Sequence, residues 1–210
     1  MPLQTFALRT APTAAGQHKQ ASLPSVAKSL GLWPHQRCAG QDVRAWAGNG
    51  RRDVHIMPMT VIIVSKESSK GGKMFADELF DKVSRYTSAR INAIKPNPRN
   101  SQAPEEQRVA EGQKVLKAIE GRDYVVVLDE RGQELSSEGL ADLVAAAGDV
   151  NRPLVFCIGG PHGHSDAVRG RADRMVRLSS MVLNHQVALV VLLEQLYRAC
   201  TILRGVPYHH

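Results

Sequence analysis

Short runs of aliphatic residues, separated by stretches with helical periodicity, limit most strongly what this chain can fold into. Residues 59–64 (MTVIIV), 124–128 (YVVVL) and 154–158 (LVFCI) are uniformly apolar and have the length of strands. Parallel strands that are covered on both faces show such continuous apolar runs. Residues 90–95 and 175–178 are two further candidate strands. Because helical stretches alternate with the strands, we expect an α/β fold with a mainly parallel sheet and helices on both faces.

Five helices are expected among these strands. In the first, Leu79 and Val83 belong to an apolar stripe at helical spacing. The third helix has two candidate caps, Ser136 and Ser137, and Gly148 is its expected end. Together with the strands, the helices make one domain over residues 57–210, which is a common domain size. The predicted helices cover residues 73–87, 105–119, 137–147, 166–174 and 186–203.

Residues 1–55 differ in composition from the rest of the chain. They contribute +5 of the formal net charge of +7, contain no acidic residue before Asp42, and are rich in Ala, Ser, Thr and Gln. This composition is typical of a chloroplast or mitochondrial transit peptide and not of a secretory signal. We expect a chloroplast location, with the mitochondrion as the alternative. Two other interpretations stay open, a disordered leader and a translation start at Met57 or Met59.

The composition argues against several classes of protein. After the leader a net charge of only +2 remains, so the pI of about 9.6 says little about nucleic-acid binding. No CxxC pair is present, and Cys157 and Cys200 lie in apolar runs, so we expect neither a disulfide scaffold nor a metal site. The uncharged apolar run of residues 187–193 is too short to span a bilayer, so no membrane partner is expected.

Three strand ends are candidates for site loops, because ligands of open α/β sheets bind beyond the carboxyl ends of the strands. These loops cover residues 128–132, 159–163 and 178–184. Gly159 and Gly160 would let backbone groups approach a ligand closely. The segment is neither a P-loop nor a GxGxxG motif. A cradle for a nucleoside-like ligand and a simple tight turn both stay open at this point.

Histidines and the C-terminal residues give weaker signals. His162 and His164 have no nearby Cys, Asp or Glu at ligand spacing, which disfavours metal binding. His185 is interpreted as a capping or surface residue at the start of the last helix. For Tyr208 and His209, a frayed end is the default interpretation. An aromatic ring followed by imidazoles can also stack on a base and contact RNA, which makes these two residues candidates for function.

A series of short motifs follows in an informative order. The motifs are VLDERG at 127–132, LSSE at 135–138, FCIGGP at 156–161 followed by Gly163, LSSM at 178–181, His185, EQLYRA at 194–199 and PYH at 207–209. In order and spacing, from about Met59 to His210, this series resembles the RlmH family of the SPOUT superfamily. Members of that family are methyltransferases that act on a pseudouridine of large-subunit ribosomal RNA.

The resemblance implies a fold, a cofactor and a set of contacts. The fold would be of SPOUT type with a deep trefoil knot in the C-terminal half, and the knot loops would bind S-adenosylmethionine. By position, Leu128 would contact the adenine side of the cofactor, and Gly159 would lie against the cofactor through its backbone. The resemblance also implies a homodimer, with the apolar helix of residues 186–203 buried at the interface. The segment that would wrap the cofactor consists of Leu178, Ser179, Ser180, Met181, Val182 and Leu183.

The reaction implied by the resemblance moves a methyl group from the sulfonium of the cofactor to N3 of the pseudouridine. Because the N3–H of a uracil-type base is a weak acid, the enzyme must align this group and help to remove its proton. Tyr208 and His209 are the candidate catalytic residues, which would position the RNA or assist proton removal. The expected partners are large-subunit rRNA or the ribosome and a second copy of the chain.

Several positions depart from the family pattern. The family commonly has Pro-His-Pro before the last helix and an Arg four residues after that His, whereas this chain has Asn184-His185-Gln186 and Leu189. The usual terminal Arg or Lys is replaced by His210. The loss of two cations weakens the expected grip on phosphate. Two alternatives therefore stay open, a SPOUT enzyme for another rRNA or tRNA site and a catalytically inactive RNA-binding factor of ribosome assembly.

Overall fold

The structure, a computed structural model, describes residues 54–65, 69–96 and 103–206. The predicted leader, apart from residues 54 and 55, lies outside these ranges, as do Tyr208 and His209. The described elements are β1 (Met59–Val64), α1 (Lys70–Ser84), β2 (Ala89–Ile94), α2 (Pro104–Lys117), β3 (Tyr124–Glu134), α3 (Ser137–Asp149), β4 (Leu154–Ile158), α4 (Asp166–Arg171), β5 (Arg174–Arg177) and α5 (His185–Leu203).

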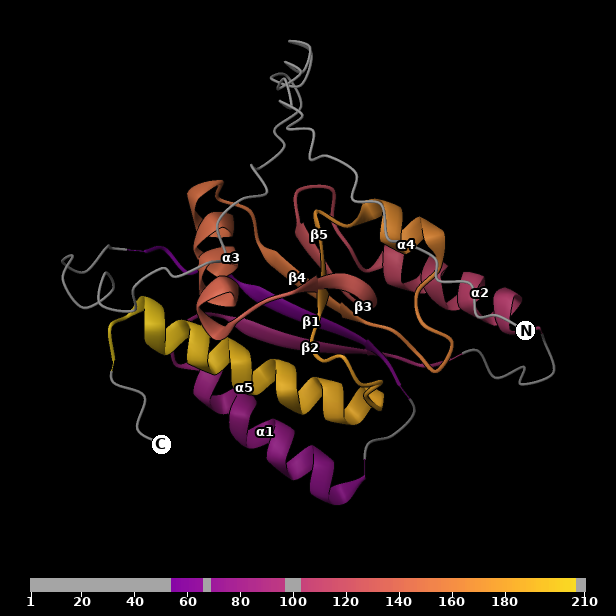
Figure 1. Ribbon diagram of the computed structural model, residues 1–210, viewed down its shortest axis with the longest axis horizontal. Helices are drawn as coiled ribbons and strands as arrows, with labels where there is room; N and C mark the ends of the chain where they lie inside the picture. Colours follow the sequence, from indigo (N-terminus) through magenta and orange to yellow (C-terminus); the bar gives the residue numbers. More distant parts are fainter. Residues whose placement is uncertain (1–53, 66–68, 97–102, 207–210) are drawn as a thin grey trace, which may run out of the picture. The chain divides into compact units, whose positions relative to one another are not determined.

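The strands form one sheet in the order β2-β1-β4-β3-β5, and every neighbouring pair is parallel (Figure 1). The predicted α/β fold with a mainly parallel sheet is confirmed. Leu154, at the start of β4, pairs with both Met59 of β1 and Tyr124 of β3. Because β4, β3 and β5 are neighbours and run in one direction, the loops that follow them meet at one edge of the sheet.

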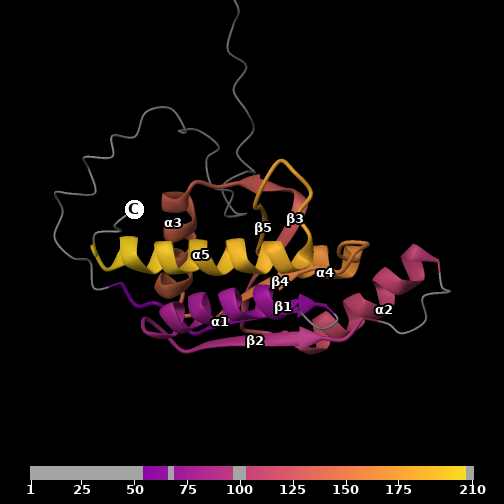
Figure 2. The ribbon, with the colours of Figure 1, turned by 90° about the horizontal axis from the view of Figure 1, so that it is seen from below.

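Helices cover both faces of the sheet (Figure 2). Helices α1, α3 and α5 lie on one face, where Phe156 of β4 and Leu192 of α5 belong to the larger core cluster. Helices α2 and α4 lie on the other face, where Cys157 packs with Val115 and Val168. Phe156 and Cys157 enter opposite clusters because successive side chains of a strand point to opposite faces. The sheet is therefore buried on both sides, as its apolar strands predict.

Helix α5 is long and apolar, and it runs beside α1 (Figures 1 and 2). Among the described residues it is the one helix whose length and composition would allow it to cross a bilayer. Half of its apolar stretch is buried inside the protein, and Leu192, Leu193 and Leu196 are almost fully enclosed. A core helix of a globular protein passes the same test of composition. Packing in the larger core cluster therefore accounts for the apolar character of α5.

Strand β3 is longer than the sequence predicts. The apolar run ends at Leu128 and a loop is expected after it, but the strand continues to Glu134. The ladder between β3 and β5 is interrupted between Leu128 and Gln133, which both pair with Val176 of β5. Residues 129–132 thus form an arch over Val176. The arch needs Gly132, because a Cβ there would lie 2.6 Å from the backbone N of Val176. The prediction of a loop after Leu128 is wrong, because the polar residues Gln133 and Glu134 pair with β5, which is distant in the sequence.

Several helix ends also differ from the prediction by a few residues. Helix α1 begins three residues earlier than expected, because the Ser69 side chain caps it by accepting a hydrogen bond from the N–H of Gly72 at 3.2 Å. Of the two candidate serines, Ser136 caps α3. Gly148 lies inside α3 and does not end it. Helix α4 stops before residue 174, since Ala172 has an extended backbone that leads into β5.

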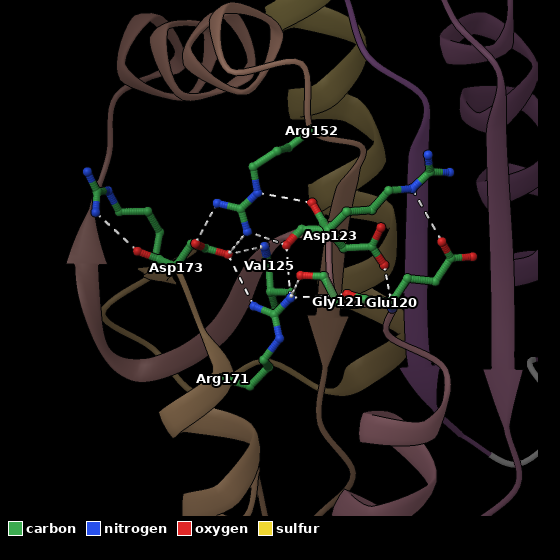
Figure 3. Close-up of polar contacts among 9 residues, drawn as sticks. Glu120, Gly121, Asp123, Val125, Arg152, Arg171 and Asp173 are labelled. Atoms are coloured by element: carbon green, nitrogen blue, oxygen red, sulfur yellow. Dashed lines mark hydrogen bonds and ion pairs between the residues drawn. The ribbon is translucent and has the colours of Figure 1, made fainter.

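The amino ends of β3, β4 and β5 are joined by an arginine network (Figure 3). Arg152 donates to both carboxylate oxygens of Asp173 at 2.8 Å, and also to the carbonyl O of Asp123. Arg171 donates to the same carboxylate at 3.3 Å and to the carbonyl O of Asp123 at 3.0 Å. Asp173 additionally accepts from the N–H of Val125. This amino-edge network of Arg152, Arg171, Asp123 and Asp173 fixes the start of β5 beside β3.

Candidate functional site

A cavity of about 590 Å³ opens at the carboxyl ends of β3, β4 and β5. Small-molecule sites commonly measure roughly 300–1,000 Å³. The loops after these strands and the start of α5 form its wall. Ser180 is exposed and is not part of this wall, although the sequence predicts a cofactor contact for it. The other predicted cofactor-binding residues all line the cavity, namely Leu128, Gly159, Leu178, Ser179, Met181, Val182 and Leu183.

The chain makes a tight turn after β4, at the wall of the cavity. The N–H of Gly163 donates to the carbonyl O of Gly160 at 2.9 Å, and Gly163 has a φ of +73°, which favours glycine. Gly159 packs against this turn, because a Cβ on it would lie 3.2 Å from the Cα of Gly163. The two interpretations left open for the glycine pair are therefore compatible, since the turn is tight and also lines the cavity.

His164 anchors the turn from inside the protein. Its side chain is buried, and Nε2 lies 3.2 Å from the carbonyl O of Cys157 on β4. Burial lowers the pKa of His164, so the ring is neutral at pH 7 and can donate Nε2–H to that carbonyl. His164 is thus a structural residue. Among the described residues, no group of three or more His, Cys, Asp and Glu could hold a metal ion.

A buried ion pair joins the arch of β3 to α4. Arg169 Nε donates to Asp129 Oδ2 at 2.8 Å, and the side chain of Asp129 is only 4% exposed. Burial by itself raises the pKa of Asp129, but hydrogen bonds from the N–H of Arg131 and the Arg169 guanidinium outweigh it and lower this pKa. The carboxylate is therefore ionised at neutral pH. We call Asp129 and Arg169 the carboxyl-edge pair, and both residues line the cavity.

The segment between β5 and α5 closes another side of the cavity. Ser179 Oγ accepts a hydrogen bond from the N–H of Met181, and the Asn184 side chain caps α5 by accepting from Gln186. Gln186 Oε1 in turn accepts from the N–H of Ser69 at the start of α1. Met181 and Val182 line the cavity, yet they are 74% and 90% exposed. The segment therefore has one side toward the cavity and presents apolar side chains to solvent.

A second cavity of about 300 Å³ adjoins the first between the sheet, α3 and α5. Leu128, Arg177 and Leu178 line both cavities. Arg177 Nη2 is held by Glu134 on the far side of the β3 arch at 2.7 Å. Leu128 and Leu178 thus separate a wide opening from a narrower apolar recess.

The sequence does not indicate two polar residues of this region. Arg169 and Arg177 line the cavity, but neither belongs to a motif with a known spacing. Arg169 sits one turn into α4 and meets Asp129 across 40 residues of chain. Only the alternation of strand, loop and helix could have indicated that these positions face one edge. No sequence pattern indicates that Arg169 and Asp129 form an ion pair.

Two buried cysteines and one ion pair contribute to the fold, and His185 contributes to the cavity. Cys157 and Cys200 are buried free thiols, and burial raises the pKa of each to about 12. Glu194 and Arg198, one turn apart on α5, form an ion pair at 2.9 Å. His185, expected as a capping or surface residue, is the first residue of α5 and lines the cavity, whereas the capping side chain is that of Asn184. The cysteines and the ion pair serve the fold.

Comparison with known protein families indicates which cofactor this protein uses. The model of a family described as "Predicted SPOUT methyltransferase" matches residues 57–209. The chain belongs to this SPOUT methyltransferase family. The superfamily indicated by the motif series is therefore confirmed. As a SPOUT methyltransferase, the chain uses S-adenosylmethionine as its methyl donor.

Individual SPOUT relatives cover most of the chain. It is 46% identical over 175 residues to a candidate RNA methyltransferase of Arabidopsis thaliana, covering 83% of this chain and 85% of the relative. It is 39% identical over 155 residues to the ribosomal RNA large subunit methyltransferase H of Trichlorobacter lovleyi, covering 73% of this chain and 100% of the relative. A solved SpoU methyltransferase, AviRb from Streptomyces viridochromogenes in complex with AdoMet, is similar with a TM-score of 0.34 and 15% identity, over 76% of this chain and 65% of that one.

Proposed function

We propose that this enzyme methylates N3 of a pseudouridine in large-subunit ribosomal RNA. The observation that carries the proposal is the cavity of about 590 Å³, which brings together Leu128 of β3, Gly159 after β4 and all of the segment 178–183 except Ser180. The resemblance assigns these same loops to the cofactor. The substrate is supported by the Trichlorobacter lovleyi relative, whose whole length is covered and which is named for the large ribosomal subunit.

The residues of the cavity fit S-adenosylmethionine. Leu128 and Leu178 supply apolar surfaces for the faces of an adenine ring. The turn that contains Gly159 brings backbone N–H and C=O groups to the wall without a side chain in the way. Glu130 adds an exposed carboxylate to the lining, which suits a ligand that carries a positive sulfonium and an ammonium group, whereas Asp129 is already paired with Arg169.

The chain's own residues have three tasks in this reaction. S-adenosylmethionine supplies a methyl group on a positively charged sulfur. The glycine turn and the segment 178–183 hold and orient the donor, and the apolar lining keeps water from it. As the bond between the methyl group and N3 forms, the N3–H bond must break and its proton must pass to a base. We assign the positioning of the RNA base to Tyr208 and the uptake of this proton to His209.

The assignment of Tyr208 and His209 supports a homodimer. The cavity includes Ala188 near the start of α5, whereas the N–H of Val206 is bound to the carbonyl O of Thr201 near its end. At roughly 1.5 Å per residue, Ala188 and Thr201 are about 20 Å apart along the helix. The two residues from Val206 to Tyr208 span at most about 7 Å. We therefore propose that Tyr208 acts in the cavity of a second copy.

Apolar side chains around the cavity give this homodimer a contact surface. Met181 and Val182 are largely exposed, and Val187 on the first turn of α5 is 49% exposed. Exposed apolar patches next to a site commonly mark an interface with another chain. In a symmetric dimer the same patch meets its own copy, and the tail of each copy can lie near the cavity of the other.

We further propose that the chain forms a trefoil knot and that residues 1–55 direct it to the chloroplast. The arch of residues 129–132 over Val176 supports the knot, because β5 passes under a segment that precedes it by more than forty residues. The composition of the leader supports the location. A fluorescent fusion of residues 1–55 should collect in chloroplasts, and collection in mitochondria would support the alternative organelle.

The proposed substrate is tested by mass spectrometry of organellar rRNA from a strain that lacks this enzyme. We expect the N3-methylpseudouridine signal to disappear and to return with the wild-type chain. An unchanged signal would contradict the proposal. Calorimetry with S-adenosylmethionine then separates the two remaining alternatives. A chain that binds the cofactor would methylate another rRNA or tRNA site, and a chain that does not bind it would be an inactive assembly factor.

The role of the tail is tested by mixing two inactive variants. His209→Ala should lose turnover but keep its affinity for S-adenosylmethionine, and Tyr208→Phe should do the same more weakly. Leu178→Asp should lose cofactor binding through the cavity wall. If the tail acts across the dimer, mixed dimers of His209→Ala with Leu178→Asp regain one complete site and hence part of the activity. No recovery in verified mixed dimers would refute action in the second copy.

A further inference from the structure

Helix α2 packs directly behind the glycine turn through two adjacent residues, Glu111 and Gly112. A Cβ on Gly112 would overlap the side chain of Ser165, the residue that caps α4. The helix can therefore approach the end of this turn closely only with glycine at position 112. One residue earlier, the side chain of Glu111 lies against Gly160, because a Cβ on Gly160 would be 2.8 Å from Glu111 Oε2.

Glu111 is an unusual residue for this position. It is 2% exposed, and its Oε1 accepts a hydrogen bond from Gln107 Nε2 at 3.1 Å. The side chain that lies against Gly160 on the same side is Val64, whose Cγ1 would be 3.3 Å from a Cβ there. A buried carboxylate costs free energy unless it is compensated by polar partners. An apolar residue of similar size would fill this space without that cost, so a carboxylate here depends on polar partners such as Gln107.

The carboxylate lies outside the cavity, whereas its neighbours are part of the wall. Gly160 lines the cavity, and so does Arg108, which precedes Glu111 by one turn of α2. Glu111 itself is not among the lining residues, so it meets the turn from the side opposite to a bound ligand. The contact of Glu111 with the cavity wall is therefore made through the backbone of Gly160.

We propose that Glu111 is a positioning residue for S-adenosylmethionine. Through Gly160, it holds the backbone of residues 159–163 in the shape that the cofactor meets. The inference rests on the proposed cofactor site in the 590 Å³ cavity. It assigns a functional role to α2, which contributes no motif to the predicted site. Glu111 makes no contact with the reacting atoms, so its effect is on cofactor affinity and not on the chemical step.

The first test is Glu111→Gln, which keeps the shape of the side chain and removes its charge. We expect the Kd for S-adenosylmethionine, measured by calorimetry, to rise about tenfold when the carboxylate that packs against Gly160 becomes an amide. The KM for the cofactor should rise in parallel while kcat at saturating cofactor stays near the wild-type value. The matched control is Glu106→Gln on the exposed side of the same helix, which should leave both constants unchanged.

A second variant guards against a purely structural effect. Glu111→Asp keeps the charge on a shorter side chain and should recover most of the cofactor affinity that Glu111→Gln loses. Melting temperature is recorded for each variant, and affinities are compared on folded protein. If Glu111→Gln and Glu111→Asp bind S-adenosylmethionine as tightly as the wild type, the positioning role is refuted. If Glu111→Gln does not fold, weak cofactor binding by a folded Glu111→Asp would refute the role of the charge.

Coupling between Glu111 and Gly160 is tested by a double-mutant cycle. Gly160→Ala places a Cβ against Oε2, so we expect its cofactor affinity to fall at least tenfold. Combined with Glu111→Ala, the added Cβ no longer meets the carboxylate, and the double variant should bind better than the product of the two single effects. Additive effects would show that Glu111 does not act through Gly160.

Failure of the cofactor site itself gives a different pattern. Leu128→Ala removes a cavity wall and should weaken cofactor binding about tenfold if the proposed site is correct. A normal Kd for Glu111→Gln with a raised Kd for Leu128→Ala refutes the role of Glu111 and keeps the site. A normal Kd for Leu128→Ala and for Leu178→Ala refutes the site, whatever the result at Glu111.

Discussion

Two arginine–aspartate clusters lie at opposite ends of the same three strands and serve different purposes. At the amino edge, Asp173 is held by Arg152, Arg171 and the N–H of Val125, and the arginines also bind backbone carbonyls. At the carboxyl edge, Asp129 is held by Arg169 and by one backbone N–H, next to a cavity of about 590 Å³. The first cluster holds the starts of the strands together, and the second forms part of the cavity wall.

The difference between the clusters lies in what the arginines bind besides the carboxylate. In both clusters burial by itself raises the pKa of the aspartate, and hydrogen bonds from its partners outweigh burial and lower the pKa. Arg152 and Arg171 also donate to the carbonyls before β3, so these donors are satisfied within the protein. Arg169 binds only Asp129 and the exposed Asp166 among the described partners, and its side chain stays at the cavity wall.

The comparison predicts that Arg152→Met has the largest effect on stability. This change removes four hydrogen bonds and leaves Asp173 with fewer partners, so we expect the free energy of unfolding to fall by about 3 kcal/mol. Urea denaturation measures this loss. Arg122→Met, at an exposed pair with Glu120, is the control and should change stability by less than about 0.5 kcal/mol. If Arg152→Met also lost less than about 0.5 kcal/mol, the amino-edge network would not be a stabilising cluster.

Arg169→Met should affect stability less and function more. Asp129 would lose its charged partner but could be hydrated from the cavity, so we expect a loss of about 1–2 kcal/mol. Because the arch and the glycine turn are no longer joined through α4, the Kd for S-adenosylmethionine should rise about tenfold. Arg152→Met should leave this Kd unchanged. Equal Kd values for the two variants would contradict the division of roles between the edges.

Unfolding measured at decreasing pH tests how much Asp129 and Asp173 contribute to stability. The folded-state pKa values of Asp129 and Asp173 are lowered, so each contributes stability above pH of about 4 that is lost as the pH falls through its folded value. Asp173→Asn and Asp129→Asn should each be less stable than the wild type at pH 7, and each should lose less stability between pH 5 and 2. If either variant lost as much stability between pH 5 and 2 as the wild type, the carboxylate that it replaces would not be stabilised by its cluster.

The smallest expected effect is the pH dependence of His164. Burial lowers its folded-state pKa, so protonation favours the unfolded chain and stability falls as the pH drops below about 6.5. His164→Gln keeps a donor for the carbonyl O of Cys157 but does not titrate. Its stability should vary by about 1 kcal/mol less than that of the wild type between pH 7 and 5. If the stability of the two proteins varied equally over this pH range, the protonated His164 ring would be hydrated in the folded protein.

Much of the fold could be predicted because its strands are buried on both faces. Burial on two sides requires continuous apolar runs, and such runs at residues 59–64 and 154–158 give the bounds of β1 and β4 correctly. Strand β3 was predicted only as far as Leu128. Its later part is polar and largely exposed, and it is a strand only because Gln133 and Glu134 pair with β5. A pattern based on hydrophobicity cannot indicate this kind of pairing.

The candidate site was predictable in part for a related reason. Loops that follow neighbouring parallel strands meet at one edge, so Leu128, Gly159 and Leu178 could be brought together from the sequence and from the family resemblance. The resemblance assigns the whole segment 178–183 to the cofactor, but Ser180 is exposed outside the wall, because the side chains of an irregular loop do not all face one way. Arg169 and Glu111 were missed, because they contact the site from helices whose packing angle no local pattern encodes.

The sequence by itself determined the order of strands and helices, the carboxyl edge as the place for ligands, and the loops that line the cavity. Those features depend on local hydrophobicity and on glycine, which act over a few residues. Only the tertiary structure decided that β3 arches over β5, that Arg152 and Arg171 close one edge, and that Glu111 lies behind Gly160. These features join residues that are distant in the chain, and their energies depend on burial and geometry that exist only in the folded protein.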